Sequence, residues 1–102
     1  MYYIVEFNPK PGARRSQIVE AYEKFARRFE KELPQFKLVG LYVRNVLLGS
    51  RPHYLAIWEF SNFSDLDEWG KTFAKDQEGQ KYAKSLVDLT TDWEAKVMSK
   101  LI

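Results

Sequence analysis

The chain has 102 residues, with 16 lysines and arginines against 14 acidic residues and a formal net charge of +2. A chain of this length folds as one domain, so we expect residues 1–102 to form a single unit. Charges of both signs are mixed along the sequence, which argues against a nucleic-acid-binding surface, and no apolar run reaches the ~18 residues of a transmembrane helix.

The absence of cysteine excludes disulfides, thiolate nucleophiles and cysteine metal sites. The start of the sequence lacks the layout of a signal peptide. We therefore expect a cytoplasmic protein with no membrane partner. Aromatic residues make up 16% of the chain, which predicts either an aromatic core or an aromatic-lined pocket.

The first third of the chain predicts a strand followed by an amphipathic helix. Residues 1–8 alternate with the two-residue period of a strand, and the prolines and glycine of residues 9–12 end it. Apolar residues then recur at helical spacing over residues 16–33. Ser16 is the expected N-cap, and Pro34 ends the helix.

Residues 38–48 and 53–60 predict two strands joined by a turn at 49–52. Within them, almost every position of 38–43 and 54–58 is hydrophobic. An antiparallel sheet with one wet face would alternate apolar with polar residues. The chain contains enough helix to cover one face only, so we expect a second copy to cover the other.

The last 40 residues predict two helices and a fourth strand. Ser64 is the expected N-cap of the first helix, Gly79 is expected to interrupt it, and a further helix follows over residues 80–88. Residues 90–102 fit both a strand of period two and a continuing helix. Two adjacent threonines at the start of that segment favour a strand.

The predicted order is strand, helix, strand, strand, helix, helix, strand. One four-stranded antiparallel sheet with helices on one face is the α+β, ferredoxin-like arrangement. The uncovered face then becomes the surface through which a homodimer forms.

Residues 2–7, with residues 10–12 leading into an amphipathic helix, resemble the opening of dimeric α/β-barrel proteins. Residues 55–61 followed by Leu66, Glu68 and Trp69, and residues 76–82, resemble one branch of that superfamily, the NIPSNAP-like and antibiotic-biosynthesis-monooxygenase-like proteins. The resemblance implies that two sheets pack face to face into a shared barrel. It also implies a small cavity between the sheet and the helices of each subunit.

Three polar residues are candidate catalytic groups: His53, Arg44 and Glu59. His53 is the only histidine and titrates near neutrality, so it is a candidate general acid or base, or else an exposed residue at a strand end. Arg44 would bind a carboxylate if it points inward and would be solvated if the strand has left the core. Glu59 is a candidate base on an inward face and an ordinary surface charge on an outward one.

Candidate ligand-binding residues are aromatic or amide side chains on the predicted strands and helices. They are Tyr3, Tyr42, Asn45, Trp58, Trp69 and Tyr82. Haem-degrading relatives pair a helix tryptophan with a later histidine; Trp69 matches the tryptophan, but no histidine follows it. With no cluster of metal-ligand residues at suitable spacing, we expect neither a metal nor a cofactor.

Two functions follow, from different classes. The first is a homodimeric small-molecule-binding protein with an aromatic-lined cavity and no established catalysis. The second is a cofactor-independent monooxygenase or isomerase acting on a small hydrophobic aromatic or lactone-like substrate. An enzyme should hold His53, Arg44 or Glu59 inside a closed cavity, whereas a binding protein should have them at the rim; a purely structural dimer should have no cavity.

Overall fold

The computed structural model describes residues 1–45 and 53–102. Its elements follow the predicted order. They are β1 (Tyr2–Pro9), α1 (Arg15–Glu32), β2 (Lys37–Val43), β3 (Tyr54–Glu59), α2 (Phe63–Lys75), α3 (Gln77–Leu89) and β4 (Thr90–Met98). The strands form one sheet in the order β2-β3-β1-β4, and every neighbouring pair is antiparallel.

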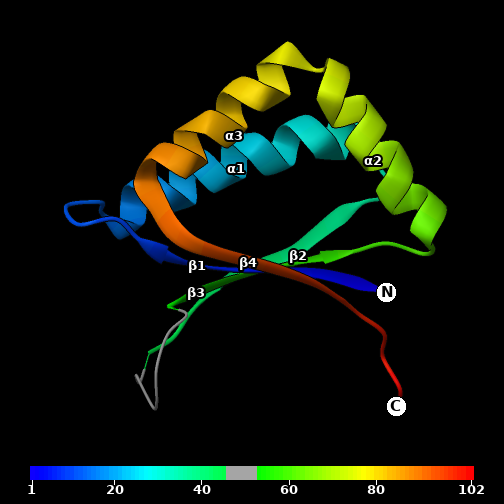
Figure 1. Cartoon of the computed structure of the whole chain (residues 1–102), viewed down its shortest axis with the longest axis horizontal. Helices are drawn as coiled ribbons and strands as arrows, with labels where there is room; N and C mark the ends of the chain where they lie inside the picture. The colour runs from blue at the N-terminus through cyan, green and yellow to red at the C-terminus, as the bar shows by residue number, and fades with distance from the viewer. Residues whose placement is uncertain (46–52) are drawn as a thin grey trace.

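All three helices lie on the same side of this sheet (Figure 1). The other side of the sheet carries no helix (Figure 1). This two-layer arrangement is the predicted α+β, ferredoxin-like fold. Within the described residues, no helix has both the length and the apolar character needed to cross a bilayer.

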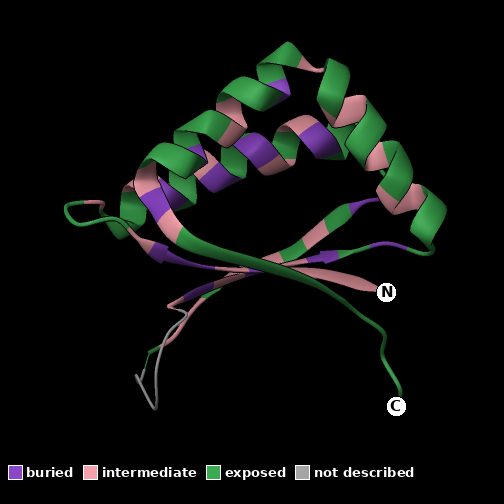
Figure 2. Cartoon of the chain, in the orientation of Figure 1, coloured by how far each residue is buried: buried purple, intermediate pink, exposed green. Residues whose placement is uncertain are grey.

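The core lies between the helices and the central strands β1 and β3. Val5 pairs with Ala56 and Phe7 pairs with Tyr54 across these strands, and all four side chains are buried. Figure 2 shows the buried residues where the helix layer and the sheet face each other, with β4 largely exposed. The alternation of strand side chains therefore directs one set of residues at the helices and the other set away from them.

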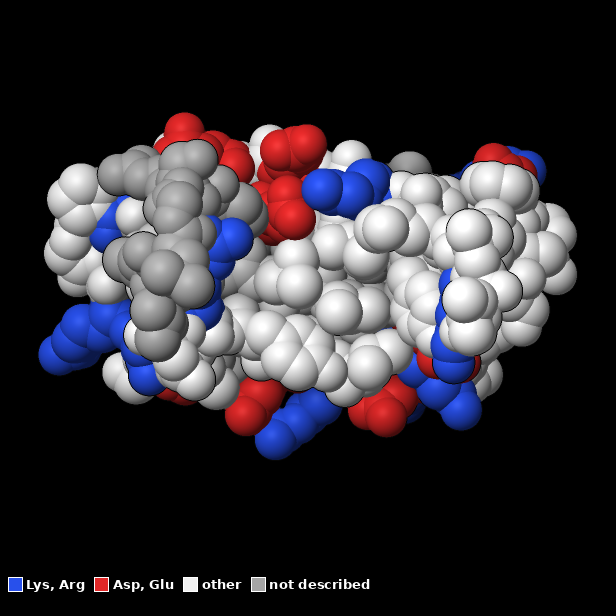
Figure 3. Space-filling model, turned by 90° about the horizontal axis from the view of Figure 1, so that it is seen from below, with Lys and Arg blue, Asp and Glu red and all other residues white. Residues whose placement is uncertain are grey.

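The uncovered face of the sheet is apolar, as the sequence predicts. Ile4 pairs with Ile57 on this face, Leu55 pairs with Tyr42, and Tyr42 is 47% exposed. Figure 3 shows uncharged side chains over the middle of the face and charged residues around its margins. An exposed apolar patch of this kind typically marks an interaction surface.

The structure corrects three predicted positions in the helices. The N-cap of α1 is Arg14, not Ser16, and the N-cap of α2 is Asn62, not Ser64. The Asn62 side chain accepts a hydrogen bond from the Asp65 backbone N–H at 3.1 Å, so α2 begins earlier than expected. Gly79 does not interrupt a helix: it lies within α3, and the break falls at Asp76.

All four predicted strands are present, and three of them are shorter than predicted. The third covers Tyr54–Glu59 instead of residues 53–60. The ambiguous C-terminal segment is a strand over Thr90–Met98. The second strand was predicted over residues 38–48 and ends at Val43. The part of that prediction beyond residue 45, and the turn at 49–52, lie outside the described residues.

An ion pair fixes the junction between α2 and α3 against α1. Arg28 donates from Nε to Asp76 Oδ2 at 2.9 Å and from Nη2 to Asp76 Oδ1 at 2.8 Å. The Asp76 side chain is only 8% exposed. A side-chain carbon at Gly79 would lie 2.6 Å from Asp76 Oδ2, so a larger residue here would displace the carboxylate that Arg28 binds.

We expect Asp76→Asn to lower the melting temperature at pH 7, because it removes the carboxylate that Arg28 binds. The hydrogen bonds from Arg28 hold the pKa of Asp76 below its ordinary value of 3.8, so the stabilisation is complete above pH 3.8. It is lost as the pH falls through the lower pKa of the folded state. The difference from wild type, followed by thermal unfolding against pH, should therefore disappear in strong acid.

Asp67→Asn is the matched control. The Asp67 carboxylate is 69% exposed and contacts Lys71 at 3.0 Å within one helix turn, so its loss should change the melting temperature little. Equal effects of the two substitutions would contradict a special role for Asp76.

Candidate functional site

A cavity of about 350 Å³ lies between the sheet and the helices. Most of its wall is aromatic or aliphatic. The lining residues are Tyr3 and Val5 on β1, Tyr22 and Phe25 on α1, Trp58 on β3, Trp69 and Phe73 on α2, Ala83, Leu86 and Val87 on α3, and Trp93, Glu94 and Ala95 on β4.

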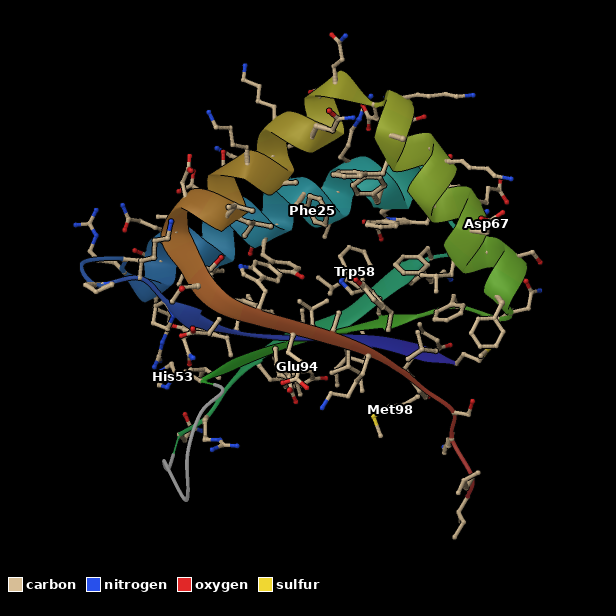
Figure 4. The ribbon with its side chains drawn as sticks, viewed as in Figure 1. Phe25, His53, Trp58, Asp67, Glu94 and Met98 are labelled. Carbon is tan, nitrogen blue, oxygen red and sulfur yellow. The ribbon has the colours of Figure 1, made fainter. Side chains whose placement is uncertain are left out.

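Aromatic rings that pack against one another form the inner wall of the cavity. Phe25 meets Trp58 edge to face, with ring centroids 5.9 Å apart at 86°. Trp69 and Phe73 lie one turn apart on α2 and stack at 5.3 Å with an angle of 2° between their planes. Figure 4 shows Phe25 and Trp58 between the helix layer and the sheet. Such packing fixes ring orientations and gives the wall a defined shape.

A few polar atoms interrupt this apolar wall. Burial raises the pKa of the Tyr22 hydroxyl well above 10, and the adjacent Trp58 indole partly offsets the shift. Burial also raises the pKa of Tyr3. Both phenols therefore stay protonated at neutral pH and remain hydrogen-bond donors.

The indole N–H of Trp69 is buried and has no hydrogen-bond partner among the described residues. A buried donor without an acceptor costs about 1–3 kcal/mol. Because Trp69 also lines the cavity, a polar ligand atom is one means of satisfying it.

The cavity is bordered by exposed hydrophobic residues of α3 and β4. Val87 is 55% exposed and Trp93 is 41% exposed. A β-bulge places Trp93 here: the β1–β4 register shifts between Glu6 and Asn8, and Asp92 has φ 57°, in the left-handed region. The Trp93 ring then stacks on Phe7 with centroids 4.8 Å apart.

Thr90 connects Trp93 to the end of α3. The Trp93 indole N–H donates to Thr90 Oγ1 at 2.7 Å, and Thr90 Oγ1 donates to the Leu86 carbonyl at 2.5 Å. Thr90 is only 2% exposed. One buried hydroxyl therefore holds the outermost ring of the cavity in place.

Similar solved structures include several proteins of the same architecture. A NIPSNAP family protein of unknown function from Agrobacterium tumefaciens is 23% identical, with a TM-score of 0.75 over 95% of this chain and 84% of that one. An uncharacterised NIPSNAP domain protein from Burkholderia xenovorans is 13% identical, with a TM-score of 0.74 over 99% and 96%. The fold is that of NIPSNAP proteins.

A dimeric ferredoxin-like protein of unknown function from Jannaschia sp. CCS1 is also similar, at 19% identity and a TM-score of 0.67 over 97% of each chain. No family model matches the sequence, and no curated protein matches it. These likenesses confirm the resemblance to the NIPSNAP-like branch at the level of the fold.

Three of the six candidate ligand-binding residues lie at the cavity, and three lie elsewhere in the structure. Tyr3, Trp58 and Trp69 line the cavity. The other three lie elsewhere: Tyr42 is exposed on the uncovered sheet face, and Asn45 is exposed beyond β2. Tyr82 on α3 donates its hydroxyl to Glu78 at 2.9 Å and does not line the cavity.

The three candidate catalytic residues lie outside the aromatic cavity. Arg44 and His53 border a separate hollow of about 250 Å³ at one end of the uncovered sheet face, together with Glu6. The His53 backbone N–H donates to Asn8 Oδ1 at 3.0 Å, which fixes the start of β3. Glu59 is exposed on the uncovered face, opposite Tyr2.

Sequence reasoning did not assign several cavity residues to the site. Tyr22, Phe25 and Phe73 follow the helical spacing that any buried helix face shows, and Trp93 falls in the predicted last strand. The bulge that reorients Trp93 has no distinct sequence signal, because Asp92 is followed by an unbroken alternation. Within residues 1–45 and 53–102, no three metal-ligand side chains gather closely enough to hold a metal ion.

We expect Thr90→Val to lower the free energy of unfolding by about 1–3 kcal/mol, because it leaves the Trp93 N–H without its acceptor. Urea denaturation followed by tryptophan fluorescence measures this loss. Thr91→Val is the control, since its neighbouring hydroxyl forms no such connection to Trp93. A Thr90→Val protein as stable as the control would contradict the structural role of the Thr90 hydroxyl.

Proposed function

We propose that this protein is a homodimeric small-molecule-binding protein whose cavity takes a small hydrophobic ligand. The observation that carries the proposal is the apolar cavity of about 350 Å³, which is lined by rings from both layers and opens between α3 and β4. Ligand sites are typically concave, mostly apolar and provided with a few polar groups. The cavity has each of these features.

The geometry favours binding over catalysis. A cofactor-independent oxygenase or isomerase needs a group inside the pocket that moves a proton. His53, Arg44 and Glu59 all lie outside the aromatic cavity. The phenols inside the cavity have raised pKa values and are poor bases at neutral pH.

The uncovered sheet face supports the homodimer. Ile4, Tyr42, Leu55 and Ile57 together form an apolar surface that the chain's own helices leave exposed (Figure 3). The solved structure from Jannaschia sp. CCS1 is described as dimeric. Face-to-face pairing of two such sheets would remove this surface from water and complete a dimeric α/β barrel.

Ile57→Lys should convert the dimer to a monomer, because it would place an ammonium group in an apolar interface. Sedimentation velocity at micromolar concentration measures the change directly.

Val19→Lys is the matched control for this substitution. Val19 is 37% exposed on α1, on the opposite layer from the uncovered sheet face, so the control should remain dimeric. A dimeric Ile57→Lys protein, or a monomeric wild type, would show that this face is not the interface.

Native mass spectrometry tests the ligand. The intact wild-type protein should carry an additional mass that is lost on denaturation, or should gain one after incubation with a hydrophobic compound. Ala83→Phe should prevent binding, because Ala83 lines the cavity and a benzyl group there would fill it. Ala74→Phe makes the same change on the exposed side of α2 and should bind like wild type.

Retention of binding in Ala83→Phe at wild-type strength would place the ligand elsewhere. Far-UV circular dichroism of both variants distinguishes a filled cavity from a misfolded protein.

A further inference from the structure

The polar atoms of the cavity are mainly donors. The Trp69 indole N–H is buried without an acceptor. Tyr22 lines the same cavity. Its hydroxyl is hydrogen-bonded to the Trp58 indole N–H, which can only donate, so the Tyr22 proton is not used in that bond. Among the described residues, no hydrogen bond is formed in which the Tyr22 hydroxyl donates. Beside the N–H of Trp69, which lacks an acceptor, the cavity therefore presents the hydroxyl of Tyr22 as a second donor.

Among the described residues, no charged side chain points into the cavity beside these donors. Of the described residues that line it, Glu94 alone is ionisable apart from the phenols. It pairs with Glu6, on the uncovered face, and Figure 4 shows its side chain directed away from the helix layer. A charged ligand would lose its hydration without gaining an opposite charge, which strongly disfavours binding.

The walls also restrict the ligand's shape. Flat rings line the space, and the planes of the stacked Trp69 and Phe73 rings are almost parallel, at 2°. Planar aromatic ligands make offset-stacked or edge-to-face contacts with such walls. A volume of about 350 Å³ is at the lower end of typical ligand pockets and suits one or two fused rings.

We propose that the ligand is a neutral aromatic compound with a carbonyl oxygen that accepts a hydrogen bond from Tyr22 or Trp69. This inference rests on the proposed ligand-binding function and specifies its chemical class. The carbonyl supplies an acceptor for these donors, and the aromatic portion occupies the apolar remainder of the cavity.

Matched pairs of probes test the acceptor. 2-Acetylnaphthalene and 2-isopropenylnaphthalene have almost the same shape and differ in C=O against C=CH₂; acetophenone and α-methylstyrene form the corresponding one-ring pair. Dissociation constants for each pair are measured by quenching of tryptophan fluorescence and by isothermal titration calorimetry. The ratio between the two members of a pair is then compared across variants, which cancels their different solubilities in water.

Tyr22→Phe removes one donor and Trp69→Phe removes the other. At least one of these substitutions should weaken the ketone relative to its hydrocarbon partner by about tenfold, the value of one buried hydrogen bond. Tyr82→Phe is the control, because its hydroxyl bonds Glu78 outside the cavity and the ratio should not change. Comparing ratios keeps the test valid when a substitution lowers affinity for both probes.

Each outcome is decisive. One outcome is that both members of a pair bind and the ratio of their dissociation constants is the same in wild type, Tyr22→Phe and Trp69→Phe. That result overturns the carbonyl inference and leaves the ligand-binding function intact. Failure of all four probes to bind up to their solubility limits counts against the proposed function itself. 2-Naphthoate should bind at least about a hundredfold more weakly than 2-acetylnaphthalene; equal affinity would overturn the requirement for a neutral ligand.

Discussion

The packing of aromatic rings between one helix layer and one sheet is the constraint on which the rest of the structure depends. Phe25, Trp58 and Trp69 are supplied by α1, β3 and α2. Rings that meet edge to face, as Phe25 and Trp58 do at 86°, hold one another in fixed orientations. The same contacts that join the two layers therefore also define an open volume between them.

The aromatic cavity and the hollow bordered by charged residues lie on opposite sides of the sheet. The helix side of the sheet holds the cavity, whereas Glu6, Arg44 and His53 border a hollow on the other side. Lys96 Nζ lies 3.3 Å from Glu6 Oε2 on that side, which partly neutralises the carboxylate. In a dimer built through the uncovered face, these charged residues would lie near the interface, while the cavity of each subunit would remain accessible from the α3–β4 edge.

The fold can be predicted from the sequence because hydrophobic residues recur with the periods of strands and helices. The two-sided hydrophobicity of 38–43 and 54–58 predicts both the sheet and its uncovered face. The alternation after residue 90 also fits a helix, and only the two adjacent threonines favour a strand there. Helix starts were less predictable, because Arg14 and Asn62 take the N-cap positions by local hydrogen bonding that competes with Ser16 and Ser64.

The candidate site was predictable in part. Tyr3, Trp58 and Trp69 are large rings at positions that the pattern directs inward. Tyr22 and Phe25 obey the same helical spacing as core residues, so sequence alone cannot separate a cavity wall from a packed interior. Asp76 illustrates the remaining difficulty: its contact with Arg28 joins residues 48 positions apart, and no local pattern reports it.

Helix α3 is fixed at both of its ends. Arg28 holds the Asp76 end, while the opposite end is held by Thr90 and by a hydrogen bond from the Lys10 N–H to the Leu89 carbonyl at 2.9 Å. The helix is thus poorly suited to swing outward as a unit. Exchange of a molecule with the cavity should instead depend on rotation of exposed side chains such as Val87, a motion of picoseconds to nanoseconds. Entry and exit would then be fast, and occupancy would follow ligand concentration without the delay of a slow conformational change.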